Sequence, residues 1–188
     1  MKTNIYFVRH AHSTYTPDEL NRPLSERGFL DAKVVTETLK SVNIDVVISS
    51  PYKRAIQTVE GIAQHFDQTI MMEEDYKERL LSKVPVDDFN NAIKKVWEDE
   101  HFSWEGGESN YIAQERGVSV TKKVLDIYHG KNIVVGTHGN IMVLIMKYFD
   151  SKYDYHFWKE LDMPDIYKLT FEGEKLIYVN HLWRRKTI

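Results

Sequence analysis

The chain has no cysteine, and that absence removes whole classes of chemistry. Disulfide bonds, thiolate catalysis and zinc or iron–sulfur sites with cysteine ligands are excluded. No stretch approaches the ~20 apolar residues of a membrane-spanning helix. The first residues, Met1–Ile5, pass directly into a predicted strand without the longer apolar core of a signal peptide. We therefore expect a cytoplasmic protein that does not bind membranes.

A strong charge of either sign is also lacking. The 188 residues include 25 Lys and Arg and 28 Asp and Glu, for a net charge of −3. This near-neutral balance does not indicate a nucleic-acid surface or a polybasic membrane patch. The length and the 42% of hydrophobic residues suit one domain with a full core. We therefore predict a single domain over residues 1–188, with no nucleic-acid partner.

Short apolar runs alternate with helical patterns along most of the chain. Such alternation is typical of βαβ units, which build a largely parallel sheet with helices on both faces. Ser25 is the predicted N-cap of the first helix. Strands are predicted at 4–8, 45–49, 69–72 and 133–137, and helices at 26–39, 51–65, 109–128 and 140–149.

Two segments depart from this alternation. Residues 166–171 and 176–181 alternate in polarity around a central glycine, which predicts an antiparallel hairpin at the sheet edge. Residues 73–108 are rich in charge and aromatics, with a predicted helix at 87–100, and we expect a lid over the C-terminal ends of the strands. The predicted fold is α/β, a three-layer α/β/α sandwich with a mainly parallel sheet, an antiparallel edge hairpin and a helical lid insertion.

Three buried strands end in polar, reactive residues. The first ends in Arg9-His10, the second is followed by Arg54, and the third ends in Thr137-His138. Because the ends of parallel strands share one edge of the sheet, these side chains should converge there. Two arginines and two histidines form a cationic pocket that suits a phosphate or a carboxylate. An imidazole can also act as a nucleophile and carry a covalent intermediate.

Five motifs in order strengthen this interpretation. Together they resemble the histidine phosphatase superfamily, in its phosphoglycerate mutase-like branch, and they extend from about residue 4 to residue 150. The matching stretches are Phe7-Val8-Arg9-His10 with Ser13, Pro23-Leu24-Ser25-Glu26-Arg27-Gly28, the segment 49–58, Gly107-Glu108-Ser109 and Thr137-His138-Gly139.

The resemblance implies a phosphatase acting on a small phosphorylated substrate, with no cofactor and no metal. His10 would attack phosphorus and become a phosphohistidine. Arg9, Arg54 and His138 would hold the phosphoryl oxygens and neutralise charge in the transition state. Further substrate contacts would come from Ser13, from Gly139 and from Thr16, whose hydroxyl stands where many relatives have an asparagine.

The resemblance also requires a carboxylic acid that protonates the leaving group. By order and local pattern Glu78 is the best match, and it could then take a proton from the attacking water. A solvated glutamate is the alternative, since other acids surround this position and the family's aromatic-glycine sequence is missing after it. Glu108 would order the pocket or cap the helix that begins near Ser109.

Two residues depart from the first motif. Ala11 replaces the usual glycine, which argues against a positive φ at this position. His12 replaces a more common Glu or Gln, and it would either contact substrate or point to solvent.

Other functions remain open from the sequence. A phosphoglycerate mutase would need an extended closing segment, and only 50 residues follow His138. A metal-dependent hydrolase could use the His10-x-His12 spacing, although Arg9 and Arg54 would repel a cation there. A non-catalytic binding module is a further alternative. The natural substrate and the oligomeric state are not predicted from the sequence. Four lid aromatics would line the pocket or form lid core: Phe89, Trp97, Phe102 and Trp104. A second aromatic cluster follows the last predicted helix and would pack on the lid or on another subunit: Tyr153, Tyr155, Phe157 and Trp158.

Overall fold

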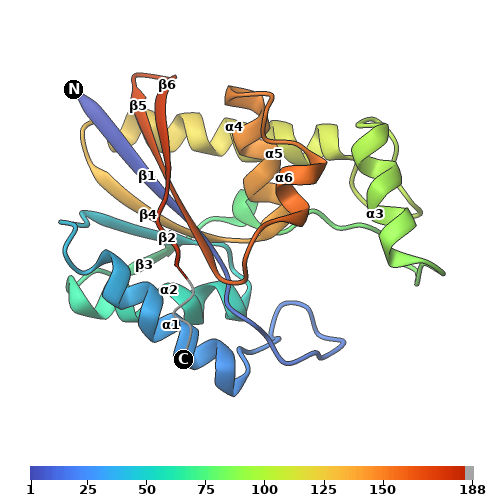
Figure 1. The fold of residues 1–188 in the computed structure, drawn as a ribbon, viewed down its shortest axis with the longest axis horizontal. Coiled ribbons are helices and arrows are strands. Elements are labelled where there is room, and N and C mark those ends of the chain that lie inside the picture. Colours follow the sequence, from blue (N-terminus) through green and yellow to red (C-terminus); the bar gives the residue numbers. More distant parts are fainter. Residues whose placement is uncertain (185–188) are drawn as a thin grey trace.

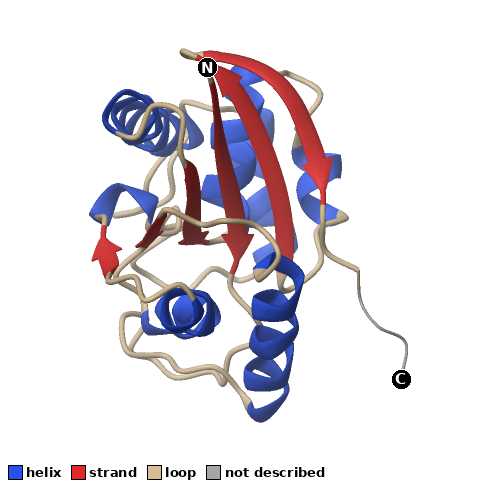
Figure 2. Cartoon of the chain, turned by 90° about the vertical axis from the view of Figure 1, so that its left-hand side faces the viewer, coloured by secondary structure: helices blue, strands red, loops and turns tan. Residues whose placement is uncertain are grey.

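A computed structural model describes residues 1–184; residues 185–188, the last four of the predicted domain, lie outside the described part. Six strands form one sheet in the order β3-β2-β4-β1-β5-β6 (Figure 2). The first four of these strands run parallel to one another. The strand β5 runs antiparallel to β1, and β6 runs antiparallel to β5. The strands are β1 (Lys2–Arg9), β2 (Val46–Ser49), β3 (Ile70–Met72), β4 (Asn132–Thr137), β5 (Asp165–Glu172) and β6 (Lys175–His181).

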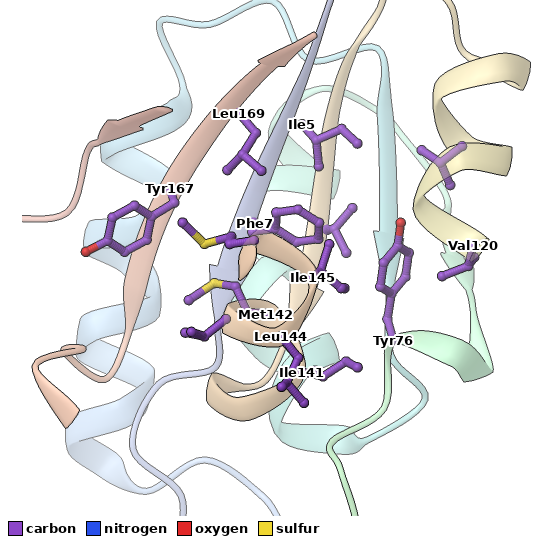
Figure 3. Close-up of a cluster of buried hydrophobic side chains, with 14 of the residues drawn as sticks. Ile5, Phe7, Tyr76, Val120, Ile141, Met142, Leu144, Ile145, Tyr167 and Leu169 are labelled. Atoms are coloured by element: carbon purple, nitrogen blue, oxygen red, sulfur yellow. The ribbon is translucent and has the colours of Figure 1, made fainter. Parts of the chain in front are cut away.

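Helices cover both faces of the sheet (Figure 1). On one face lie α1 (Glu26–Leu39) and α2 (Lys53–His65), and on the other lie α4 (Asn110–Ile127) and α5 (Gly139–Phe149). Successive side chains of a strand point to opposite faces. Accordingly, Ile5 and Phe7 of β1 pack with α4 and α5, whereas Tyr6 and Val8 pack with α1 and α2. Figure 3 shows the first of these two cores.

This architecture confirms the predicted three-layer α/β/α fold with its antiparallel edge hairpin. Ser25 is the N-cap of α1, and its side chain accepts a hydrogen bond from the backbone N–H of Gly28 at 3.1 Å. Ala11 does not have a positive φ, as predicted. Among the described non-glycine residues, Asp67 alone has one. The sequence analysis did not predict the 3-10 turn η1 (Glu74–Tyr76) or the short helix α6 (Tyr155–Lys159).

The segment between η1 and α4 contains α3 (Phe89–Glu98), which lies within the predicted helix 87–100. Trp97 attaches α3 to the rest of the protein: its Nε1 donates to Oδ1 of Asn140 in α5 at 3.2 Å, and its ring packs on α6. The ring of Trp97 lies 6.4 Å from that of Trp158 and 6.3 Å from that of Tyr155, measured between centroids. Tyr155 and Trp158 of α6 therefore pack on α3, within the predicted lid. Among residues 1–184, no helix combines the length and the apolarity that crossing a membrane requires.

Candidate active site

The predicted strand ends meet at one edge of the sheet. In the strand register, Arg9 pairs with Thr137 and Ser49 with Gly136, so β1, β4 and β2 end side by side. The backbone N–H of His10 donates to the carbonyl of Thr137 at 2.9 Å. As a result the imidazole rings of His10 and His138 lie edge to face, with centroids 5.2 Å apart.

The hydrogen bonds of His10 define its tautomer. Its Nδ1 lies 2.7 Å from the carbonyl oxygen of Ala11, which can only accept. Its Nε2 lies 3.3 Å from Nε of Arg54, which can only donate. The proton therefore resides on Nδ1, and Nε2 presents a lone pair. Burial, helped by the nearby positive charge of Arg54, lowers the pKa of His10 to about 3, so the ring is neutral near pH 7.

The second histidine, His138, is completely buried. Its Nε2 lies 2.7 Å from Oγ of Ser50, which in turn accepts from the backbone N–H of Tyr52 at 3.2 Å. The Ser50 hydroxyl can donate to Nε2, and a neutral His138 that accepts this hydrogen bond carries its proton on Nδ1. That Nδ1 is buried and has no hydrogen-bond partner in the described chain. Burial, together with His10 and Arg54, lowers the pKa of His138 well below its ordinary value, so His138 is a neutral donor.

Arg9 is held from two sides. Its Nη1 donates to the carbonyl oxygens of Leu161 at 3.3 Å and Asp162 at 3.0 Å, in the loop between α6 and β5. On the other side its guanidinium lies against Gly139, where a Cβ atom would be 3.0 Å from Nε of Arg9. Burial lowers the pKa of Arg9, while the carboxylates of Glu78 and Asp165 act in the opposite direction. Gly139 therefore provides the space that the guanidinium occupies.

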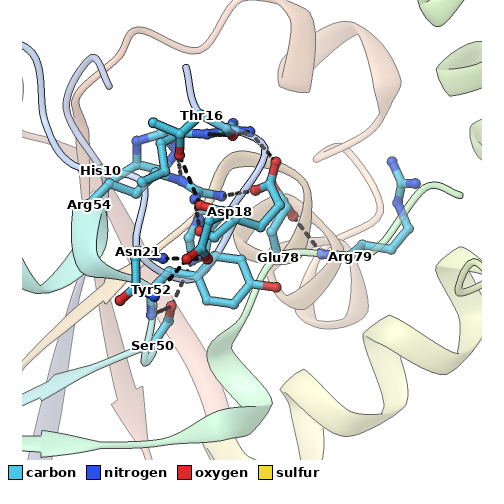
Figure 4. A network of polar contacts seen from close by, with 12 residues as sticks. His10, Thr16, Asp18, Asn21, Ser50, Tyr52, Arg54, Glu78 and Arg79 are labelled. Atoms are coloured by element: carbon cyan, nitrogen blue, oxygen red, sulfur yellow. Dashed lines mark hydrogen bonds and ion pairs between the residues drawn. The ribbon is translucent and has the colours of Figure 1, made fainter. Parts of the chain in front are cut away.

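Arg54 is buried and uses all three guanidinium nitrogens. Besides the contact with His10, Nη1 donates to the carbonyl of Glu19 at 2.8 Å and Nη2 to its carboxylate at 3.1 Å. The same carboxylate also pairs with Arg22. Neither Glu19 nor Arg22 is predicted as a site residue from the sequence, although Arg22 directly precedes the Pro23-Leu24-Ser25 element. Figure 4 shows Arg54 and His10 within the wider set of polar contacts around the site.

Glu78 lies at the N-terminus of α5. Its Oε1 accepts from the backbone N–H groups of Arg79 at 2.8 Å and Ile141 at 3.0 Å, and its Oε2 accepts from that of Asn140 at 3.1 Å. The first turn of a helix offers such unpaired donors to a carboxylate. Glu78 is therefore a fixed residue beside the phosphate-binding candidates and not a solvated side chain.

The remaining predicted residues lie around the loop 13–24. Ser13 forms an isolated antiparallel bridge with Leu24. The hydroxyl of Thr16 donates to the carbonyl of Asp18 at 3.1 Å, within the loop. His12 is exposed, and its Nδ1 lies 2.8 Å from Oγ of Ser25. His12 thus contacts the N-cap of α1, and no group of three His, Cys, Asp or Glu residues suited to a metal gathers within residues 1–184.

A cavity of about 510 Å³ adjoins these residues. Its lining includes the charged side chains of Arg9, Arg54 and Glu78 and apolar side chains such as Phe89 and Trp158. Trp104 lines a different cavity of about 440 Å³ within the segment 82–105. Of the lid aromatics, Phe89 therefore lines the candidate site, whereas Trp97 packs against the protein core.

The sheet and its edge define an α/β protein with a cationic pocket that suits a phosphoryl group and with a neutral imidazole against Arg54, one of the residues that line this pocket. The chain belongs to the histidine phosphatase superfamily (branch 1), whose model matches residues 5–183.

Similar proteins include both phosphatases and a mutase. The chain is 23% identical to a putative phosphoserine phosphatase 2 of Hydrogenobacter thermophilus, over 95% of each chain. It is 25% identical to a 2,3-bisphosphoglycerate-dependent phosphoglycerate mutase of Methanococcus vannielii, over 94% of this chain and 95% of the relative. A phosphoserine phosphatase of Entamoeba histolytica, solved with 3-phosphoglyceric acid, has the same fold (TM-score 0.80, 18% identity, 97% and 98% of the two chains).

Proposed function

We propose that this protein is a phosphatase that hydrolyses small phosphate monoesters through a phosphohistidine on His10. The observation that carries the proposal is the state of that imidazole: it is neutral, protonated on Nδ1 and presents the Nε2 lone pair. A nucleophile in this form needs no prior deprotonation. Names of similar proteins, which include phosphoserine phosphatases, support hydrolysis of a small phosphorylated substrate.

The proposed reaction has two steps. Nε2 of His10 attacks phosphorus, the P–O bond to the alcohol breaks, and the leaving oxygen takes the proton of the Glu78 carboxylic acid. Arg9, Arg54 and the Nδ1–H of His138 hold the phosphoryl oxygens as negative charge builds on them. Water then attacks the phosphohistidine, gives its proton to Glu78, and releases phosphate as the P–N bond breaks.

The alignment lengths favour hydrolysis over mutase activity. The match to the mutase extends over 224 aligned positions, against 194 for the phosphoserine phosphatase. The mutase therefore has internal segments that this chain lacks, and a mutase must enclose its product in order to phosphorylate it again. We further propose that the segment 73–108 acts as the lid within a single domain, and that the enzyme works in the cytoplasm without a cofactor.

Phosphate release from p-nitrophenyl phosphate tests this proposal. The wild-type protein should release phosphate and the His10→Ala variant should not. Circular dichroism should show that both proteins are folded. A coupled assay for conversion of 3-phosphoglycerate to 2-phosphoglycerate should give little product. Robust isomerisation would replace the phosphatase proposal with the mutase alternative, and an active His10→Ala variant would contradict the assigned nucleophile.

A further inference from the structure

The backbone that carries Glu78 lies outside helices and strands. It follows the short η1 turn and continues as irregular chain through Leu80. The carboxylate accepts from the backbone N–H groups of Arg79 and of the first turn of α5, but no ladder or helix fixes the backbone from which it extends. Contacts from elsewhere in the fold must do so.

Arg116 of α4 supplies three contacts to this backbone. Its Nη1 donates to the carbonyl oxygens of Asp75 at 2.7 Å and Lys77 at 3.0 Å. Its Nη2 donates to the carbonyl oxygen of Glu78 itself at 3.3 Å. One side chain thus binds three carbonyl groups within four consecutive residues, and these residues end at the proposed proton donor.

Glu108 fixes the guanidinium in turn. The two carboxylate oxygens accept from Nε and Nη2 of Arg116 at 2.7 and 2.8 Å, which is the bidentate geometry of a strong pair. The backbone N–H of Glu108 also donates to the carbonyl of Leu80 at 2.7 Å. Glu108 therefore binds both Arg116 and the chain two residues beyond Glu78.

Arg116 differs from the arginines that are candidates for phosphate binding, because its N–H donors are already used within the protein. A guanidinium has five N–H donors, and those of Arg116 match five acceptors: two carboxylate oxygens and three carbonyls. No donor remains for a substrate. Burial by itself would raise the pKa of Glu108, but the hydrogen bond and charge of Arg116 lower it, so the pair is ionised near pH 7. Such a pair gains little stability for a fold, and a positioning role accounts for it better.

We propose that Arg116 and Glu108 form a clamp that positions Glu78 for protonation of the leaving group. Arg116 is thus a positioning residue, acting through the backbone of the residues 75–78. The inference rests on the proposed role of Glu78 as proton donor. The clamp also gives a role to Glu108, which belongs to one of the motifs of the resemblance. Glu108 does not cap α4, because the N-cap of that helix is Ser109.

The clamp predicts a loss that depends on the leaving group. Expulsion of p-nitrophenolate needs little help from an acid, whereas expulsion of an alkoxide depends on one. The Arg116→Lys variant keeps the charge and loses the planar fork. We expect kcat for an alkyl phosphate such as β-glycerophosphate to fall on the order of tenfold, with kcat for p-nitrophenyl phosphate changing by about twofold or less.

The experiment compares four variants with the wild type on both substrates. Glu78→Gln should give the largest loss of kcat on the alkyl phosphate relative to p-nitrophenyl phosphate, because it removes the proton donor itself. Arg116→Lys and Glu108→Gln should show the same selective loss at smaller size. Arg27→Lys is the matched control, because Arg27 is exposed and its pair with Asp31 is loose, at 3.7 Å; it should behave as wild type. Glu108→Gln retains the packing and keeps the test valid if the Arg116 variant folds poorly.

The outcomes separate the clamp from the proposed function. If Glu78→Gln is selective for the alkyl ester but both clamp variants lose the two activities equally, or lose neither, the clamp is wrong and Glu78 keeps its role. If Glu78→Gln itself shows no selectivity, another acid is the donor, and the clamp and that part of the proposed function are both overturned.

Discussion

Replacing His10 with asparagine should make the protein less sensitive to acid. The buried ring has a pKa of about 3 in the fold, against about 6.5 in an unfolded chain. As the pH falls below 6.5, His10 binds a proton in the unfolded state but not in the folded state. The stability that is present above this pH is therefore lost progressively toward pH 3. At pH 5 the loss from this one side chain is about 2 kcal/mol.

Urea unfolding, followed by the fluorescence of the four tryptophans, measures this loss at pH 8 and at pH 5. The variant should lose about 2 kcal/mol less than the wild type between these two conditions, because all other titrating groups are common to both proteins. His138 remains in both and cancels in the comparison. Equal losses in the two proteins would refute the conclusion that the fold holds His10 neutral, and with it the argument for a ready nucleophile.

Three further substitutions test the surroundings of the site. Glu19→Gln should lower the KM for substrate and the inhibition constant of phosphate by about two- to fivefold, which corresponds to the free energy of a half-exposed ion pair. The reason is that Arg54 loses the carboxylate that competes with phosphate for its guanidinium; unchanged values would contradict this. Gly139→Ala should reduce kcat/KM on the order of tenfold, since the new Cβ meets Arg9 at 3.0 Å, and wild-type kinetics would show that the guanidinium has room. Phe89→Ser should raise the KM of naphthyl phosphate several-fold more than that of phosphoserine; equal effects would place Phe89 outside the binding surface.

The fold could be predicted because its strands carry their own signal. The runs around Val8, Val47 and Val134 are short and apolar, as strands buried on both faces require. Their order with helices between them then implied the parallel sheet. The short helix α6 escaped prediction because its five residues are mostly aromatic, a composition common in strands as well.

The same reasoning brought Arg9, His10, Arg54 and His138 together, because the ends of parallel strands share an edge. It could not find Glu19, which lies in an irregular loop whose conformation depends on tertiary contacts. It could not assign Arg116 either. A lone arginine on a long helix is indistinguishable in sequence from a solvated one, and only the fold shows which carbonyl groups it binds.

The most direct test of the account is the identity of the phosphorylated side chain. The enzyme is mixed with substrate, quenched in denaturing alkali within the first turnover, and digested for mass spectrometry. We expect a phosphoryl group that is stable in alkali, lost in acid and located on His10. A phosphoryl group on any other residue, or turnover without a phosphoenzyme, would contradict it.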